Sequence, residues 1–137
     1  MAELLLSVHV LAAILAIGPV AVAASLFPRH AREPGAGAAL LHRVCRVYAV
    51  VGITVPVFGF ATAAQLGVLG DAWLLTSIAL TAAAAAVLAF AILPTQRRLL
   101  AAPGDTGRLA MATGIFNLLW AVVVVLMIVR PGSTTGA

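Results

Sequence analysis

The segment LAMATGIFNLLWAVVVVLMIV (Leu109–Val129) contains no charged residue in 21 positions. At about 1.5 Å per residue, a helix of that length spans the hydrocarbon core of a bilayer, which is roughly 30 Å thick. Backbone groups in lipid must bond within their own segment, so the stretch is predicted to be a transmembrane helix.

Three further apolar stretches of similar length precede it in the chain. The fold class predicted is therefore all-α, a four-transmembrane-helix bundle with up-down-up-down topology. The helices are expected at about 4–27, 38–66, 72–93 and 106–129, within a single domain of residues 1–130. Residues 131–137 are small and polar, and are expected to form a flexible tail.

Signals at the ends of the stretches support these limits. Proline at Pro28 and at Pro94 is expected to end the first and third helices. Asp71 is placed to cap the third helix, and Asp105 or Thr106 to cap the fourth. Trp73 is expected to anchor the outer membrane interface.

The composition agrees with a membrane protein. The chain has 137 residues, of which 64% are hydrophobic and 9% charged, and its mean hydropathy is +1.17. Soluble domains carry about 25% charged residues, so lipid must be the solvent. The net charge of +4 comes from arginine alone, and its confinement to short segments argues against a nucleic-acid partner.

Seven of the eight arginines lie in two segments that connect apolar stretches. They are Arg29, Arg32, Arg43 and Arg46 in the first segment and Arg97, Arg98 and Arg108 in the second. The positive-inside rule then places both segments in the cytoplasm and both termini outside. The Ala- and Arg-rich, Lys-free composition points to a bacterium, so we expect a multi-pass protein of the plasma (inner) membrane.

These arginines, together with His30 and His42, are candidates for contact with anionic lipid head groups or with a cytoplasmic partner. The alternative is a basic surface that is merely solvated. Glu3 precedes the first apolar stretch and no positive charge does, so a retained helix is expected rather than a cleaved signal peptide.

His9 is an ionisable residue inside the first apolar stretch, SVHVLAAILAIGP (Ser7–Pro19). It shares a helical stripe with Ala12, Ala13, Ala16 and Ala23, and small residues favour close helix packing, so His9 is expected to face the bundle. One hypothesis makes it a ligand of haem b or a metal, or a proton-handling group, with Met127 or His9 of a second copy as the other ligand. The other makes it a neutral imidazole bonded to a neighbouring helix.

Two further polar residues lie near the middle of the membrane. Asn117 is expected to form an interhelical hydrogen bond. Thr54 is expected to bond its own backbone or to bridge to Asn117, and the alternative is that both line a path for a small solute. Pro19 and Pro56 fall inside predicted helices and are expected to kink them.

Several classes of activity lack their residues in this chain. No Asp, Glu, Lys or Arg lies in the middle of a predicted span, whereas proton-coupled exporters need an intramembrane carboxylate. The single cysteine, Cys45, rules out an intrachain disulfide. No nucleophile–base–acid set or nucleotide-binding loop is present, so an enzyme is not expected.

The stretch LLLSVHVLAAILAIGPVAVAASLFPRHAR, with its early histidine and Arg-rich exit, resembles the first helix of several small bacterial membrane proteins. These are the copper-resistance protein D family, the HemJ-like protoporphyrinogen oxidases, and a domain-of-unknown-function family of four-helix integral membrane proteins. The last resemblance covers nearly the whole chain and implies the four-helix fold. The HemJ-like resemblance implies a haem-linked role for His9, but those enzymes also depend on a lysine and this chain has none.

The sequence thus favours a non-enzymatic structural, accessory or partner-binding membrane protein, either homo-oligomeric or bound to another membrane protein. A haem- or metal-binding redox protein that uses His9 is the first alternative, and a small-solute permease is the second.

Overall fold

The computed structural model describes residues 2–33 and 35–131, and these form helices and the connections between them. Four stretches are long and apolar enough to cross a membrane, namely Glu3–Ala31, Gly37–Leu66, Ala72–Ala101 and Gly107–Val129. The prediction of an all-helical protein with four membrane spans is confirmed at this level. The predicted tail, residues 131–137, lies outside the described residues from residue 132 onward.

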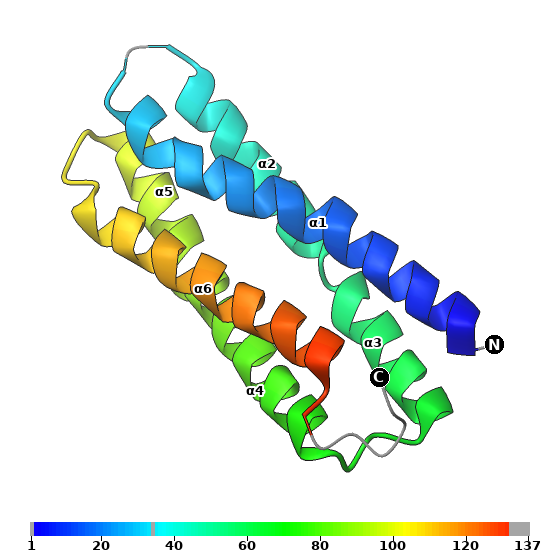
Figure 1. The fold of residues 1–137 in the computed structure, drawn as a ribbon. Coiled ribbons are helices and arrows are strands. Elements are labelled where there is room, and N and C mark those ends of the chain that lie inside the picture. The colour runs from blue at the N-terminus through cyan, green and yellow to red at the C-terminus, as the bar shows by residue number, and fades with distance from the viewer. Residues whose placement is uncertain (1, 34, 132–137) are drawn as a thin grey trace.

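The spans are built from seven helical segments (Figure 1). In chain order they are α1 (Ala2–Ala31), α2 (Gly37–Val51), α3 (Thr54–Leu66), α4 (Ala72–Val87), the π-helix η1 (Leu88–Ile92), α5 (Leu93–Ala101) and α6 (Gly107–Val129). The second span consists of α2 and α3, and the third of α4, η1 and α5. The connections 32–36 and 102–106 lie at one end of the molecule, and the connection 67–71 lies at the other.

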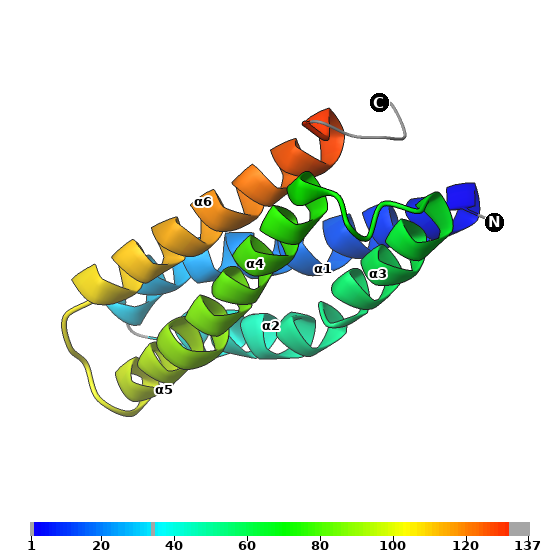
Figure 2. The same cartoon turned by 90° about the horizontal axis from the view of Figure 1, so that it is seen from below.

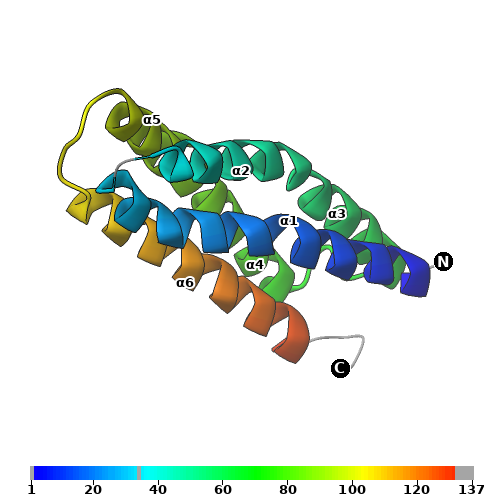
Figure 3. The ribbon, with the colours of Figure 1, turned by 90° about the horizontal axis from the view of Figure 1, so that it is seen from above.

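Helix α1 is the centre of the packing. It contacts α2 and α3 along one side and α6 on another, as Figure 3 shows. Helix α4 packs along α6, whereas α3 packs along α1 and meets α4 only next to the 67–71 connection. The pair α1–α3 therefore diverges from the pair α4–α6 toward the end that carries the 67–71 connection (Figure 2).

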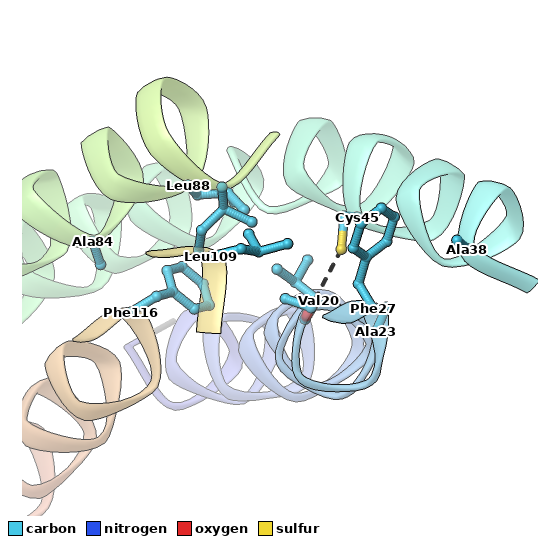
Figure 4. Close-up of a cluster of buried hydrophobic side chains, with 11 residues drawn as sticks. Val20, Ala23, Phe27, Ala38, Cys45, Ala84, Leu88, Leu109 and Phe116 are labelled. Atoms are coloured by element: carbon cyan, nitrogen blue, oxygen red, sulfur yellow. Dashed lines mark hydrogen bonds between the residues drawn. The ribbon is translucent and has the colours of Figure 1, made fainter. Parts of the chain in front are cut away.

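The main apolar cluster lies nearer the opposite end (Figure 4). Val20, Ala23, Ala24 and Phe27 of α1 are its buried residues on the central helix, and alanine there lets neighbouring backbones approach. The same cluster includes Cys45 of α2, Leu88 and Ile92 of the third span, and Leu109 and Phe116 of α6. A second cluster of Ala63, Val68, Trp73 and Leu74 holds the start of α4 against the end of α3.

Two predicted helix ends are wrong because the helices continue through proline. Helix α1 runs past Pro28 to Ala31, and the third span runs past Pro94 to Ala101. Proline removes one N–H group and crowds the carbonyl four residues earlier. The wide π-turn η1 ends at Ile92, two residues before Pro94, and such a turn accommodates the ring without ending the helix. The third connection therefore shrinks to residues 102–106.

The predicted kink at Pro56 is present as a break between α2 and α3, at Gly52 and Ile53. Hydrogen bonds to the carbonyl three residues earlier replace the α-helical pattern there. The Ile53 N–H donates to the Val50 carbonyl and the Val55 N–H to the Gly52 carbonyl, both at 3.1 Å. The break redirects the second span so that α3 follows α1.

Helices α4 and α6 begin close to the predicted residues, but the hydrogen bonds at these starts differ from simple N-capping. Asp71 is the N-cap residue of α4, but its carboxylate accepts a hydrogen bond from Trp73 Nε1 at 3.1 Å rather than from a backbone N–H of the helix. Asp105 accepts from the Gly107 N–H at 3.0 Å, at the start of α6. The Trp73 side chain is buried in the second cluster and lies under the Arg130 guanidinium, 5.5 Å from the ring centroid, and its role as an anchor at the outer interface stays a prediction.

Candidate functional sites

His9 lies at the contact between α1 and α3. Its Nδ1 is 2.8 Å from the Val55 carbonyl oxygen, and a carbonyl can only accept, so Nδ1 carries the proton and donates. The residue is only 7% exposed, and Ala16 and Ala23 of the same stripe are buried as well. The prediction that this face of the helix turns toward the bundle is confirmed.

Gly59, one turn beyond Val55, makes room for the His9 ring. A Cβ atom at Gly59 would lie 2.8 Å from Cε1 and 3.1 Å from Nδ1 of the imidazole, which is too close for any real side chain. Glycine thus allows α3 to approach α1 at the height of the histidine.

The haem and metal hypothesis for His9 finds one supporting feature. Donation from Nδ1 to a backbone carbonyl leaves Nε2 as the nitrogen with a free lone pair, as in metal-ligating histidines. Within residues 2–33 and 35–131, however, no group of three or more His, Cys, Asp or Glu side chains is arranged to hold a metal. His9 lines neither of the two grooves described below, one beside α2 and the other between α1 and α6.

Met127, the proposed second ligand, has different neighbours from His9. It packs against the second apolar cluster, and its carbonyl accepts a hydrogen bond from Arg130 Nε at 3.3 Å. His9 instead packs on Val55 and Gly59 of α3. The contacts of the two side chains therefore favour packing roles, and ligation by the pair stays a prediction.

Asn117 forms the interhelical hydrogen bond that its position predicts, and the partner is on α1. Its Nδ2 donates to Ser25 Oγ at 3.1 Å. Thr54 uses its own backbone instead, donating to the Val51 carbonyl at 2.8 Å from an exposed position. The two residues thus bond to different elements, and this arrangement lends no support to a shared solute path.

The Ser25–Asn117 pair opens onto a groove between α1 and α6, of about 450 Å³. The groove is lined by Ala21, Val22, Ser25, Leu26, Asn117 and Trp120. Three buried polar atoms on this side of α6 have no hydrogen-bond partner among the described residues, namely Thr113 Oγ1, Asn117 Oδ1 and Trp120 Nε1. Their spacing of four and three residues places them on one helical face.

A buried polar network that sequence reasoning missed joins α2 to α5. His42 Nδ1 lies 2.8 Å from Gln96 Oε1 and donates to it, and Gln96 Nε2 is 3.6 Å from Cys45 Sγ. His42 is 6% exposed and Gln96 is fully buried. The interpretation of His42 as part of a solvated basic loop is therefore wrong, because α2 turns this residue inward against Phe27 and α5.

The arginines of the two basic segments remain at the surface. Arg29 forms an ion pair of 3.7 Å with Glu33, and Arg98 donates to Thr95 Oγ1 at 3.1 Å. Arg32 and Arg97 are exposed. Arg43 and Arg46 line a second groove together with His42, so the first basic segment contains both loop residues and groove residues.

Comparison of the chain with protein-family models, with curated proteins and with solved structures found no match. The resemblance of the first helix to the three membrane-protein families stays a prediction.

Proposed function

We propose that this chain is a non-catalytic, partner-binding protein of a bacterial plasma membrane, and that its partner is a second copy of itself. The Ser25–Asn117 pair carries the proposal, because it presents a hydroxyl and an amide to a groove on the surface formed by two membrane-spanning helices. Polar groups on such a surface are poorly accommodated by lipid and are typical of contacts between helices.

The residues around the pair suit a helix–helix contact. Ala21 and Ser25 are small and four residues apart, so they lie on one face of α1 and allow another backbone to come close. The pair also contains an unused donor and an unused acceptor, since its hydrogen bond uses one of the two Asn117 Nδ2 hydrogens and one of the two lone pairs of the exposed Ser25 Oγ. A second copy supplies the same groups, so a two-fold contact satisfies the donor of one chain with the acceptor of the other.

Self-association can be measured on purified protein across a range of protein-to-detergent ratios by sedimentation equilibrium. Intramembrane hydrogen bonds contribute about 0.6 kcal/mol each, so loss of two symmetric bonds in S25A should weaken the dimer roughly sevenfold. S7A is the matched control, because Ser7 lies on the same helix, is exposed, and bonds its own backbone at Glu3. A wild-type protein that stays monomeric at every ratio would overturn the proposal.

The membrane orientation belongs to the same proposal. Arg29, Arg32, Arg97, Arg98 and Arg108 border the connections 32–36 and 102–106, which lie together at one end of the molecule. We infer that this end faces the cytoplasm, because positive charge is retained there. Both termini are then outside, and the spans alternate in direction.

Haem binding by His9 is the second candidate, supported by the Nε2 lone pair that the Val55 hydrogen bond leaves free. The absorption spectrum of the purified protein tests it. A Soret band that disappears in H9A would support haem ligation, and a colourless protein that does not take up added haem would refute it.

A further inference from the structure

We propose that the groove between α2 and the end of α5 is a binding site for the head group of one anionic phospholipid. The groove has a volume of about 480 Å³ and is lined by Ala39, His42, Arg43, Arg46, Val47, Val50 and Leu100. It lies on a different surface from the Ser25–Asn117 groove, so this proposal stands independently of self-association.

The charge in the groove is positive and uncompensated. Arg43 and Arg46 are three residues apart, lie on the same side of α2 and are both exposed. Neither has an ion-pair partner in the described part of the chain, where Arg29 and Glu33 form the ion pair. No acidic residue occurs in α2 or in α5, the two helices that line the groove. A phosphate diester complements such a pair of guanidinium groups.

His42 gives the groove a fixed polar wall. Its ring is held by the hydrogen bond from Nδ1 to Gln96 Oε1, and Gln96 is fully buried. The second ring nitrogen, Nε2, makes no hydrogen bond among the described residues and is not one of the buried unpaired atoms, so it is accessible from the groove that His42 lines. Because Nδ1 carries the proton, Nε2 is an acceptor, and a head-group hydroxyl can donate to it.

The apolar part of the groove favours a lipid over a free phosphate. Val47 and Val50 continue the same stripe of α2 and are 50% and 68% exposed. Val50 lies about 10 Å along the helix from Arg43, farther from the basic connections and deeper in the membrane span Gly37–Leu66. A phospholipid places its charged group beside the arginines and its acyl chain along the valines, whereas inorganic phosphate fills only the first position.

Native mass spectrometry of the full chain in detergent tests the proposal, with phosphatidylglycerol and phosphatidylcholine of identical acyl chains as probes. We expect one phosphatidylglycerol per chain to be retained in preference to phosphatidylcholine. An arginine near a membrane surface changes binding by about fivefold, so R43Q/R46Q should lose roughly 25-fold in affinity. R108Q/R32Q removes the same charge outside the groove and should retain the lipid.

Each contrary result has a defined meaning. Equal retention of the two lipids, or equal loss in the two double variants, would overturn the site because it would show only diffuse attraction. Displacement of the lipid by millimolar glycerol phosphate would overturn the proposal that the valines bind an acyl chain. The groove would then bind phosphate groups in general. Far-UV circular dichroism melts of both double variants verify folding, and because all four arginines are exposed we expect unchanged midpoints.

Discussion

Single polar residues fix the contacts between helices in this protein. His9 donates to the Val55 carbonyl, His42 to Gln96, and Asn117 to Ser25. Each bond joins two different spans, and the bonds of His9 and His42 satisfy polar groups that would otherwise be buried without a partner. Alanine-rich helix faces pack closely, and these bonds add specific contacts between them.

The contact between His9 and Gly59 predicts that G59A destabilises the protein. The added methyl group would lie 2.8 Å from His9 Cε1, and the ring cannot move away without losing its bond to Val55. Overpacking of this kind costs about 1–3 kcal/mol, which exceeds the gain of roughly 0.5–1 kcal/mol from replacing a helical glycine by alanine. Thermal melting in detergent should show the lower midpoint.

Gly114 supplies the control for that substitution. It is also helical, but a Cβ atom there would meet nothing within 4 Å, so G114A should be neutral or stabilising. Adding H9A to G59A removes the clash and should recover part of the loss. Equal melting points for G59A and G114A would show that the ring yields freely.

The buried network at His42 predicts that Q96L is destabilising by about 1–3 kcal/mol, since it leaves the buried imidazole without an acceptor. Q65L is its matched control, because Gln65 is exposed on α3 and its loss should change little. Chemical denaturation followed by circular dichroism compares the two. If Q65L proved as harmful as Q96L, the network would have no special role.

The sequence identifies some of these residues and not others, for a physical reason. His9 and Asn117 stand alone in apolar surroundings, so an interhelical role could be predicted for each. His42 and Gln96 are surrounded by arginines, and their pattern is that of a solvated segment near the membrane surface. Only the extension of α2 and α5 toward the basic end brings the two inside, and no local pattern encodes that pairing.

At the scale of the elements, proline has two different effects in this chain. Pro56 follows a break at Gly52–Ile53, whereas Pro94 follows a π-turn within a continuous span. The sequence gives the positions of both prolines. Whether the helix breaks or continues depends on whether the backbone compensates for the missing hydrogen bond by a break or by a π-turn. The four spans could thus be predicted, and two of their ends could not.

The break before Pro56 predicts that P56A straightens the second span and moves the end of α3. A change of about 20° in direction, which is typical of a proline kink, would displace a residue 12 positions beyond the break by roughly 6 Å. Spin labels at Leu4 and Gln65, both exposed, would report this change as a distance measured by double electron–electron resonance in a C45A background.

V57A is the control for the straightening, because Val57 is exposed on the same turn of α3 and its truncation restores no backbone donor. Its label-to-label distance should equal that of the protein with Pro56. An unchanged distance in P56A would mean that packing of α3 against α1, rather than proline, determines the direction of the helix.

At the scale of the whole molecule, charge and packing are concentrated at the same end. The main apolar cluster and the His42–Gln96 network lie on the side of the basic connections, while the pairs α1–α3 and α4–α6 diverge toward the 67–71 connection. At the diverging end the second cluster joins the end of α3 to the start of α4, and Arg130 lies over Trp73. The basic end is therefore expected to be the more rigid one.

That arrangement gives the last prediction, which concerns orientation. Alkaline phosphatase fused after Ala137 should be active in bacterial cells, and green fluorescent protein fused after Ala102 should fluoresce, because the positive-inside rule holds the arginine-rich end in the cytoplasm. Replacing all seven arginines of that end by lysine preserves the charge and should preserve both signals. Replacing them by glutamine, with three arginines inserted after Gly70, should abolish phosphatase activity after Ala137 and fluorescence after Ala102, since orientation follows the charge difference across the membrane. A fluorescent fusion after Ala137 in the unaltered chain would contradict the proposed orientation and would place the lipid groove in the outer leaflet.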